Sequence, residues 1–172
     1  MNLEEFNTNF AKHGGARSYL FKCVLGFPSD VYTPPNMLYM AKATSIPEAS
    51  LGEIPIYWQG MNNKLPGPRT YGDWSVTLIL QNDWGIRYAF EEWLQKINNW
   101  SGGGSYDGSI GYRNQTQTLT LLDERINIDI KVITLVNSWP KSIGAVTLDY
   151  GTQEVASFDV TFAYQYFEFK DV

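Results

Sequence analysis

Alternation of apolar and polar residues predicts several β-strands along the chain. In DWSVTLIL, residues 73–80, Trp74 and Val76 begin a series of apolar side chains at every second position, as in a strand buried on one face. The same period of two recurs in the runs 126–136 and 157–169, the latter being the longest. Shorter strands are predicted at residues 18–27, 37–44, 119–123 and 145–151. The pattern therefore predicts a mainly β chain.

One stretch has the helical period instead. In NDWGIRYAFEEWLQKINN, residues 82–99, a single apolar face repeats about every 3.6 residues, which predicts an amphipathic helix over about residues 83–98. That face consists of Ile86, Phe90, Trp93, Leu94 and Ile97. Asn82 or Asp83 is expected to cap its start. The stretch SGGGSYDGS, residues 101–109, predicts a flexible loop.

The segment TSIPEASLGEIPIYWQG, residues 44–60, combines two properties that rarely occur together. Its two prolines and two glycines argue against a long helix or a central strand. It also carries several large apolar side chains, which an ordinary exposed loop does not need. These side chains are expected either to close one end of the subunit's own core or to pack against another subunit.

Composition favours assembly. The 172 residues are expected to form one domain, 1–172, and 44% of them are apolar, enough for a sizeable core. Charged residues make up 18% and aromatic residues 15%. Subunit interfaces favour Tyr, Trp and Phe over Lys and Glu, so this balance indicates surface that is hidden in an assembly.

Charge and cysteine content narrow the possible partners. A net charge of −5 argues against wrapping nucleic acid, which requires a basic surface. The single cysteine, Cys23, lies in a strand-like run and is expected to be a buried thiol. The start MNLEEFNTNF has no secretory character, and no run approaches the roughly 20 apolar residues of a membrane span. We therefore expect a cytoplasmic protein without a membrane partner.

Catalytic and metal-binding patterns are not found in the sequence. The only histidine, His13, lies among glycines, and there is no HExxH, GxSxG or GxxxxGK[ST] pattern. Glu91 and Glu92 are adjacent, so on a helix they diverge by about 100° and are expected to be solvated. We expect no enzyme, cofactor or metal. The six tryptophans leave a sugar-binding β-sandwich as one alternative.

Several long segments resemble one protein family. HGGARSYLFK, KATSIPEASLGEIPIYWQG, PGPRTYGDWSVT and the AFEEW helix occur in an order similar to that of the tail tube proteins of T4-like contractile-tailed phages. This similarity extends over roughly the first hundred residues, and DVTFAYQYFE resembles the last strand of the family. Residues 101–111 match least well.

The pattern of strands with one helix predicts an antiparallel β-sandwich or barrel with one flanking helix, an α+β fold with little α, and the resemblance implies the same fold. The resemblance also implies hexameric rings whose sheets join edge to edge into a larger ring-shaped barrel, and which stack head to tail inside a contractile sheath. The expected partners are the sheath outside, the baseplate and tail terminator at the ends, and the tape-measure protein and DNA inside, without sequence-specific binding. The expected location is the virion tail, after assembly in the host cytoplasm. Protein-delivery tubes of type VI secretion systems and pyocins share this design and are the main alternative.

With this resemblance, segment 44–60 is expected to be a protruding, hairpin-like interface. Its prolines and glycines are expected to break regular strand pairing within its own chain. The expected interface residues are Ile46, Leu51, Ile54, Ile56, Tyr57 and Trp58.

The strand pattern also predicts a channel surface. The expected core positions are Trp74, Val76, Ile128, Ile130, Phe158 and Val160. The opposite, polar positions are Asp73, Ser75, Thr77, Asn127, Asp129, Lys131, Asp159, Thr161 and Gln165. Facing a channel, such a mildly negative surface would repel phosphate and let DNA slide. An ordinary solvated sheet face is the alternative. The acidic arm MNLEEF is expected either to assist contact between rings or to restrain polymerisation.

Overall fold

The computed structural model describes the chain except for residues 1, 14, 36, 100–109, 124–127 and 172, so the predicted glycine-rich loop 101–109 lies outside the described residues. Its helices are α1 (Leu3–His13), α2 (Gly85–Ile97) and α3 (Ile110–Arg113), with a 3₁₀ turn η1 (Met37–Tyr39). Its strands are β1 (Phe21–Leu25), β2 (Ala41–Thr44), β3 (Ala49–Trp58), β4 (Met61–Tyr71), β5 (Trp74–Ile79), β6 (Gln115–Leu122), β7 (Asp129–Ile143), β8 (Ser157–Ala163) and β9 (Tyr166–Asp171).

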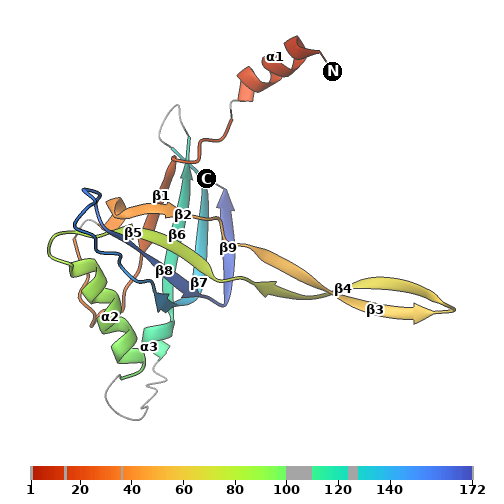
Figure 1. The fold of residues 1–172 in the computed structure, drawn as a ribbon. Coiled ribbons are helices and arrows are strands. Elements are labelled where there is room, and N and C mark those ends of the chain that lie inside the picture. Colours follow the sequence, from red (N-terminus) through yellow and green to blue (C-terminus); the bar gives the residue numbers. More distant parts are fainter. Residues whose placement is uncertain (1, 14, 36, 100–109, 124–127, 172) are drawn as a thin grey trace.

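Two antiparallel sheets share the long strand β7 (Figure 1). Sheet A has the order β1-β6-β7-β9, and sheet B has the order β7-β8-β5-β2. β7 passes from one sheet to the other at Asn137, whose positive φ of 56° bends the strand. β8 and β9 pair with β7 on either side of that bend. The predicted antiparallel β fold with a flanking amphipathic helix is confirmed, and the described strands form no closed barrel within one subunit.

The core lies between the inner faces of the two sheets and α2. Phe90 on α2 is at its centre, with ring centroids 4.9 Å from Phe27, 5.9 Å from Phe162 and 6.4 Å from Phe158. Ile86, Phe90 and Trp93 are fully buried, as the helical pattern predicts. The helix begins after Trp84, and the Asp83 side chain accepts a hydrogen bond from the Gly85 amide at 3.1 Å.

The predicted core positions in β5 and β8 are confirmed, but those in residues 126–136 are wrong. Ile133 and Leu135 are fully buried, whereas Ile128 and Ile130 are 51% and 52% exposed. The register explains the difference: Ile133 lies opposite the buried Leu119, so pairing with β6 puts Ile133 and Leu135 inside and leaves Ile130 in phase with Val132 and Thr134 outside. Lys131 lies opposite Leu121 but Asp129 lies opposite Leu122, so a bulge at Ile130 also takes Asp129 out of phase with Lys131. Alternation in the sequence indicates two distinct faces, and pairing with β6 decides which of them is buried.

Three other strand predictions need correction. Residues 145–151 form no strand, because they belong to the exposed connection between β7 and β8. The run 157–169 forms two strands, because the strand is interrupted at Tyr164 and Gln165, where the chain follows the bend in β7. The run 37–44 begins with the 3₁₀ turn η1 before β2.

Candidate assembly surfaces

The predicted protrusion is a two-stranded hairpin, β3–β4, that extends well away from both sheets (Figure 1). Its strands pair from Trp58–Met61 to Ala49–Tyr71, with one irregularity between Leu51 and Glu53. Gln59 and Gly60 form the turn, with φ of 48° and 82°, a left-handed pair that suits the twist of a tight hairpin.

The expectation that prolines and glycines break strand pairing in this segment is therefore wrong. Pro55 lies opposite Lys64, and Pro66 lies opposite Glu53, inside the ladder. In a two-stranded ribbon each strand is an edge strand, and every second amide points away from its partner. Proline is tolerated at such positions because no ladder hydrogen bond is lost.

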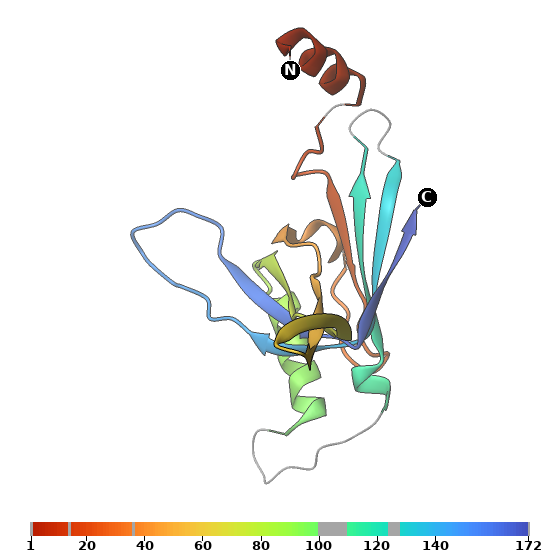
Figure 2. The same ribbon diagram turned by 90° about the vertical axis from the view of Figure 1, so that its right-hand side faces the viewer.

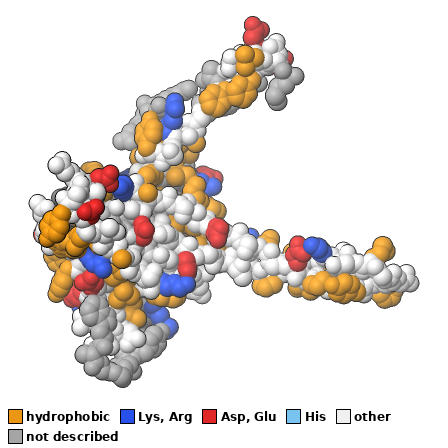
Figure 3. Space-filling view, viewed as in Figure 1, with side chains coloured by type: hydrophobic (Ala, Val, Ile, Leu, Met, Phe, Trp, Pro, Cys, Tyr) orange, Lys and Arg blue, Asp and Glu red, His pale blue; other side chains and the backbone are white. Residues whose placement is uncertain are grey.

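The hairpin has one apolar face. Ile54, Ile56 and Trp58 alternate along β3, and Leu65 and Met61 lie opposite two of them on β4. All five side chains are exposed, and they contribute to the apolar strip along the hairpin in Figure 3. The other face carries the Lys64–Glu53 ion pair, with 2.6 Å between Nζ and Oε2. An isolated two-stranded hairpin is marginally stable in water, so this exposed apolar face makes the hairpin a candidate interface.

All six predicted interface residues are exposed and are separate from the core. Ile54, Ile56 and Trp58 share the apolar face, whereas Tyr57 alternates to the opposite face, and Leu51 lies beyond the irregularity. Ile46 lies at the base of the hairpin, where it lines a groove of about 360 Å³. Sequence reasoning missed Met61 and Leu65. The Gln59–Gly60 turn could have predicted them, because it sets the register that pairs Met61 with Trp58 and Leu65 with Ile54.

The structure brings together five of the nine predicted channel residues on the outer face of sheet B: Asp73, Ser75, Thr77, Asp159 and Thr161. Thr77 donates a hydrogen bond to Asp159 across the strands at 2.6 Å. Asp73 forms an ion pair with Lys141 at 2.5 Å. This face is therefore polar, but its charges are partly compensated.

Three of the other four lie elsewhere, so the eight predicted channel residues that the structure describes do not form one surface. Asp129 lies on the outer face of sheet A, 3.1 Å from the Lys22 ammonium. Lys131 is on the inner side, with its ammonium 4.1 Å from the centre of the Phe169 ring. Gln165 is in the turn before β9 and accepts a hydrogen bond from Asn137 at 2.5 Å. Asn127 lies outside the described residues.

A second candidate channel surface, the outer face of sheet A, was missed by sequence reasoning. One cross-strand row places Val24, Thr118, Thr134 and Glu168 side by side. The next row contains Lys22, Thr120, Val132 and Lys170, of which Thr120 is buried in the single subunit. The face is mostly threonine and valine, and its few charges are of both signs.

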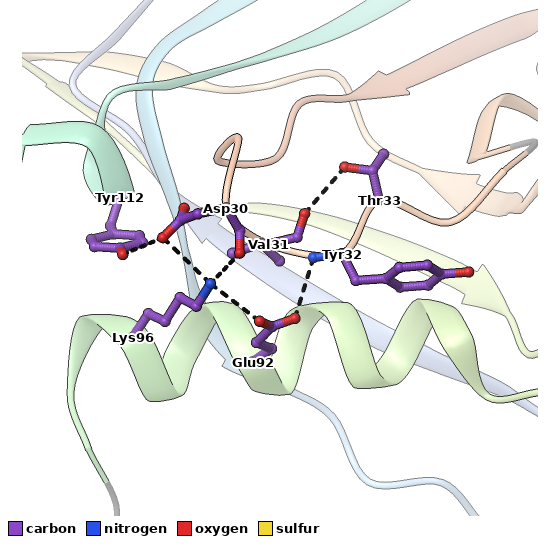
Figure 4. Close-up of polar contacts among 7 residues, drawn as sticks. All are labelled: Asp30, Val31, Tyr32, Thr33, Glu92, Lys96 and Tyr112. Atoms are coloured by element: carbon purple, nitrogen blue, oxygen red, sulfur yellow. Dashed lines mark hydrogen bonds and ion pairs between the residues drawn. The ribbon is translucent and has the colours of Figure 1, made fainter.

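A polar cluster fastens the loop after β1 and α3 to helix α2 (Figure 4). The Lys96 ammonium lies 3.1 Å from Glu92 and 3.4 Å from Asp30, and the Tyr112 hydroxyl donates to Asp30 at 2.5 Å. The Tyr32 amide donates to Glu92 at 3.2 Å. The hydrogen bond from Tyr112 is the main cause that holds the pKa of Asp30 below its ordinary value. Glu92 is thus an anchor of this cluster and not only a solvated residue.

Replacing Asp30 with Asn is expected to lower the free energy of unfolding at neutral pH by no more than about 1 kcal/mol, because the carboxylate is largely solvent-exposed. The folded pKa of Asp30 is lowered, so its stabilisation is present above the ordinary value of 3.8 and is lost as pH falls through the folded value. Urea titrations at several pH values test this, with Glu154→Gln as the exposed control. An equal loss for Asp30→Asn at all pH values would contradict it.

Other candidate residues have structural positions. Cys23 is buried, and that burial raises the pKa of its thiol to about 12, as expected of an unreactive core cysteine. Trp74 and Trp93 are buried, and the exposed Trp58 and Trp84 lie on different elements, so the described tryptophans provide no shared sugar platform.

The described residues contain no group of three His, Cys, Asp or Glu side chains arranged to hold a metal. None of the described helices has the length and apolar content that crossing a membrane requires.

Comparison with known proteins identifies relatives along nearly the whole chain. A family model described as phage tail tube protein matches residues 5–170. Tail tube protein gp19 of Enterobacteria phage T4 is 25% identical over 169 residues, which cover 98% of this chain and 100% of that protein. The tail tube protein of Serratia phage KSP90 is 27% identical over 156 residues, covering 88% of this chain and 87% of that protein.

Solved structures share the fold at lower identity. A chain in the anti-feeding prophage baseplate has a TM-score of 0.66 at 16% identity, covering 91% of this chain and 96% of that chain. A chain in the PVC sheath–tube complex of an extracellular contractile injection system has a TM-score of 0.62 at 15% identity, covering 96% and 97%.

Proposed function

The chain belongs to the phage tail tube protein family, and from that premise we propose that its copies form hexameric rings that stack head to tail into a hollow tube. It is a structural component of the virion tail. The finer proposals are that the tube conducts DNA during infection, that it assembles in the host cytoplasm, and that it has no catalytic activity.

The observation that carries ring formation is the arrangement of sheet A. Among the described strands, β1 and β9 are its two outer strands, and each pairs on one side only. An antiparallel sheet of four strands has outer strands that run in opposite directions. The β9 strand of one copy can therefore pair antiparallel with β1 of the next copy while both copies keep the same orientation along the ring axis. Closure of the ring removes both exposed edges.

We further propose that the outer face of sheet A lines the channel; the support is that its inner face is largely buried in the core. A surface of threonine and valine with the charges of Lys22, Lys170, Asp129 and Glu168 has no basic excess. DNA binding without slip requires many phosphate contacts to Lys or Arg, so this wall favours sliding. The five residues gathered on sheet B would then face away from the channel.

The hairpin β3–β4 is proposed to pack on a neighbouring subunit through its apolar face. The expected interface comprises Ile54, Ile56 and Trp58 with Met61 and Leu65, and Ile46, Leu51 and Tyr57 at its margins. The support is that these side chains are exposed in the single subunit and do not contribute to its own core.

The proposed partners follow from the family and from the solved assemblies. The matched structures include a sheath/tube terminator, a baseplate and a tube-terminating cap. We accordingly propose a sheath outside the tube, baseplate and terminator proteins at its ends, and a tape-measure protein and DNA within it. A protein-delivery tube is the second candidate, because contractile injection systems share the fold, but the curated phage relatives are more similar in sequence.

Electron microscopy of the concentrated, purified full chain tests the assembly. Rings or hollow rods of uniform width with sixfold end-on views are expected, and a reconstruction is expected to pair β9 with β1 of the next copy. If purified protein stays monomeric, tail baseplates are added as a template and the sample is imaged again. Monomers that persist on the template would overturn the proposal, and a wall built from sheet B would overturn the assignment of the channel.

A further inference from the structure

Helix α1 has an apolar face that is exposed in the described part of the chain. Leu3, Phe6 and Phe10 are spaced on one side of the helix and are 73%, 52% and 54% exposed. The two phenylalanine rings stack with centroids 5.7 Å apart. Both ribbon views place α1 clear of the sheets (Figures 1 and 2). A helix of 11 residues is marginal by itself in water, so its apolar face indicates a docking partner.

A pocket of about 460 Å³ lies at the opposite end of sheet A from α1. It is lined by Arg113, Asn114, Asn137, Trp139 and Gln165. The strand register gives the position of this pocket. α1 precedes β1, and Phe21 at the start of β1 lies opposite Leu121, near the end of β6. Leu25 at the other end of β1 lies opposite Gln117, and the pocket residues lie at that end, near the starts of β6 and β9 and the bend of β7.

We propose that α1 of one copy docks into this pocket of the copy in the next ring. The inference rests on the proposed tube, because copies stacked in one orientation bring the α1 end of one sheet A to the pocket end of the next. Such a contact joins two different surfaces and can repeat without limit, as a growing tube requires.

The chemistry of the two surfaces is complementary. Arg113 presents a cation at the exposed rim of the pocket, and Glu4 and Glu5 lie in the first turn of α1. Trp139 is half-buried and offers an aromatic surface for Phe6 and Phe10. The acidic start of the chain thus acts as a connector between rings and not as a brake on polymerisation.

Cross-linking in the assembled full chain tests the contact directly. The double variant Asn7→Cys with Asn114→Cys, which keeps both Phe6 and Phe10, is treated with a short bismaleimide and is expected to give a ladder of covalent multimers in tubes. Cys23 is buried and should stay silent. The control replaces Asn114→Cys by Tyr150→Cys, a fully exposed position in the β7–β8 connection, and is expected to give no ladder. Tubes without a ladder, or links only within one chain, would overturn the inference.

A second variant removes the aromatic contacts. Phe6→Ser with Phe10→Ser is expected to leave rings but to reduce the protein in sedimentable tubes by about tenfold or more, the scale of losing central aromatic anchors. Thr8→Ala, on the polar side of α1, is the control and should form tubes like the unmodified chain. Normal tubes from the double serine variant would also overturn the inference. Failure of the unmodified chain to form rings or tubes on a baseplate would instead overturn the proposed function, and this inference with it.

Discussion

Ile54→Asp is expected to give a folded monomer that no longer assembles. The side chain is 49% exposed at the centre of the apolar face of β3–β4, so a carboxylate there has little effect on the single subunit. In an assembled interface it would be desolvated without a partner, which costs several kcal/mol and is enough to abolish association. Far-UV circular dichroism and thermal unfolding should match the unmodified chain, while sedimentation and electron microscopy should show neither rings nor tubes.

The structure supplies a matched control for this experiment. Asn62→Asp introduces the same charge on the same hairpin, but Asn62 lies opposite Tyr57, on the face that carries the Lys64–Glu53 ion pair. Tyr57 is only at the margin of the proposed interface and Asn62 is on the polar face, so this variant is expected to assemble. Leu51→Asp tests how far the interface extends past the irregularity at the base of the hairpin. An unfolded Ile54→Asp protein would mean that the hairpin supports its own subunit, and normal tubes would mean that this face is not an interface.

Phe90→Ala is expected to destabilise the subunit by about 3–5 kcal/mol, the usual range for deleting a large buried aromatic side chain. Phe90 is fully buried and its ring contacts Phe27 from the loop after β1, Trp93 from its own helix, and Phe158 and Phe162 from β8. Removing it leaves a cavity where α2 joins the two sheets. Urea unfolding of the monomer gives the measurement.

Tyr88→Ala is the control on the same helix. Tyr88 is 60% exposed and is expected to change stability by no more than about 0.5 kcal/mol. A loss for Phe90→Ala as small as that of Tyr88→Ala would contradict the central position of Phe90 in the core.

The high aromatic content serves two purposes that the composition alone does not separate. Phe90, Trp93 and Phe162 hold α2 on sheet B. Trp58 and Phe6 are exposed on projections that extend away from the sheets. A single subunit thus has an aromatic core and, in addition, exposed apolar surface that this core does not cover.

The sequence by itself determined the mainly antiparallel β fold, the position of α2, and the family. These features depend on local signals. The apolar face of α2 repeats over three turns, β5 alternates cleanly, and the segments around residues 44–60 have an unusual composition. Exposure of Ile54, Ile56 and Trp58 also agrees with an apolar segment that does not serve its own core.

Only the tertiary structure decided which face of each strand is buried and where the strands end. A period of two marks two faces of a strand but not the buried one, and a bulge of one residue at Ile130 separates Lys131 from Asp129. The bend at Asn137 divides the run 157–169 into β8 and β9. In β3, Tyr57 lies on the face opposite to that of Trp58, and the register of β3 with β4 places Met61 beside Trp58. Hydrogen bonding between strands distant in sequence sets the first two of these, so no local pattern contains them, whereas the Gln59–Gly60 turn sets the register of β3 with β4.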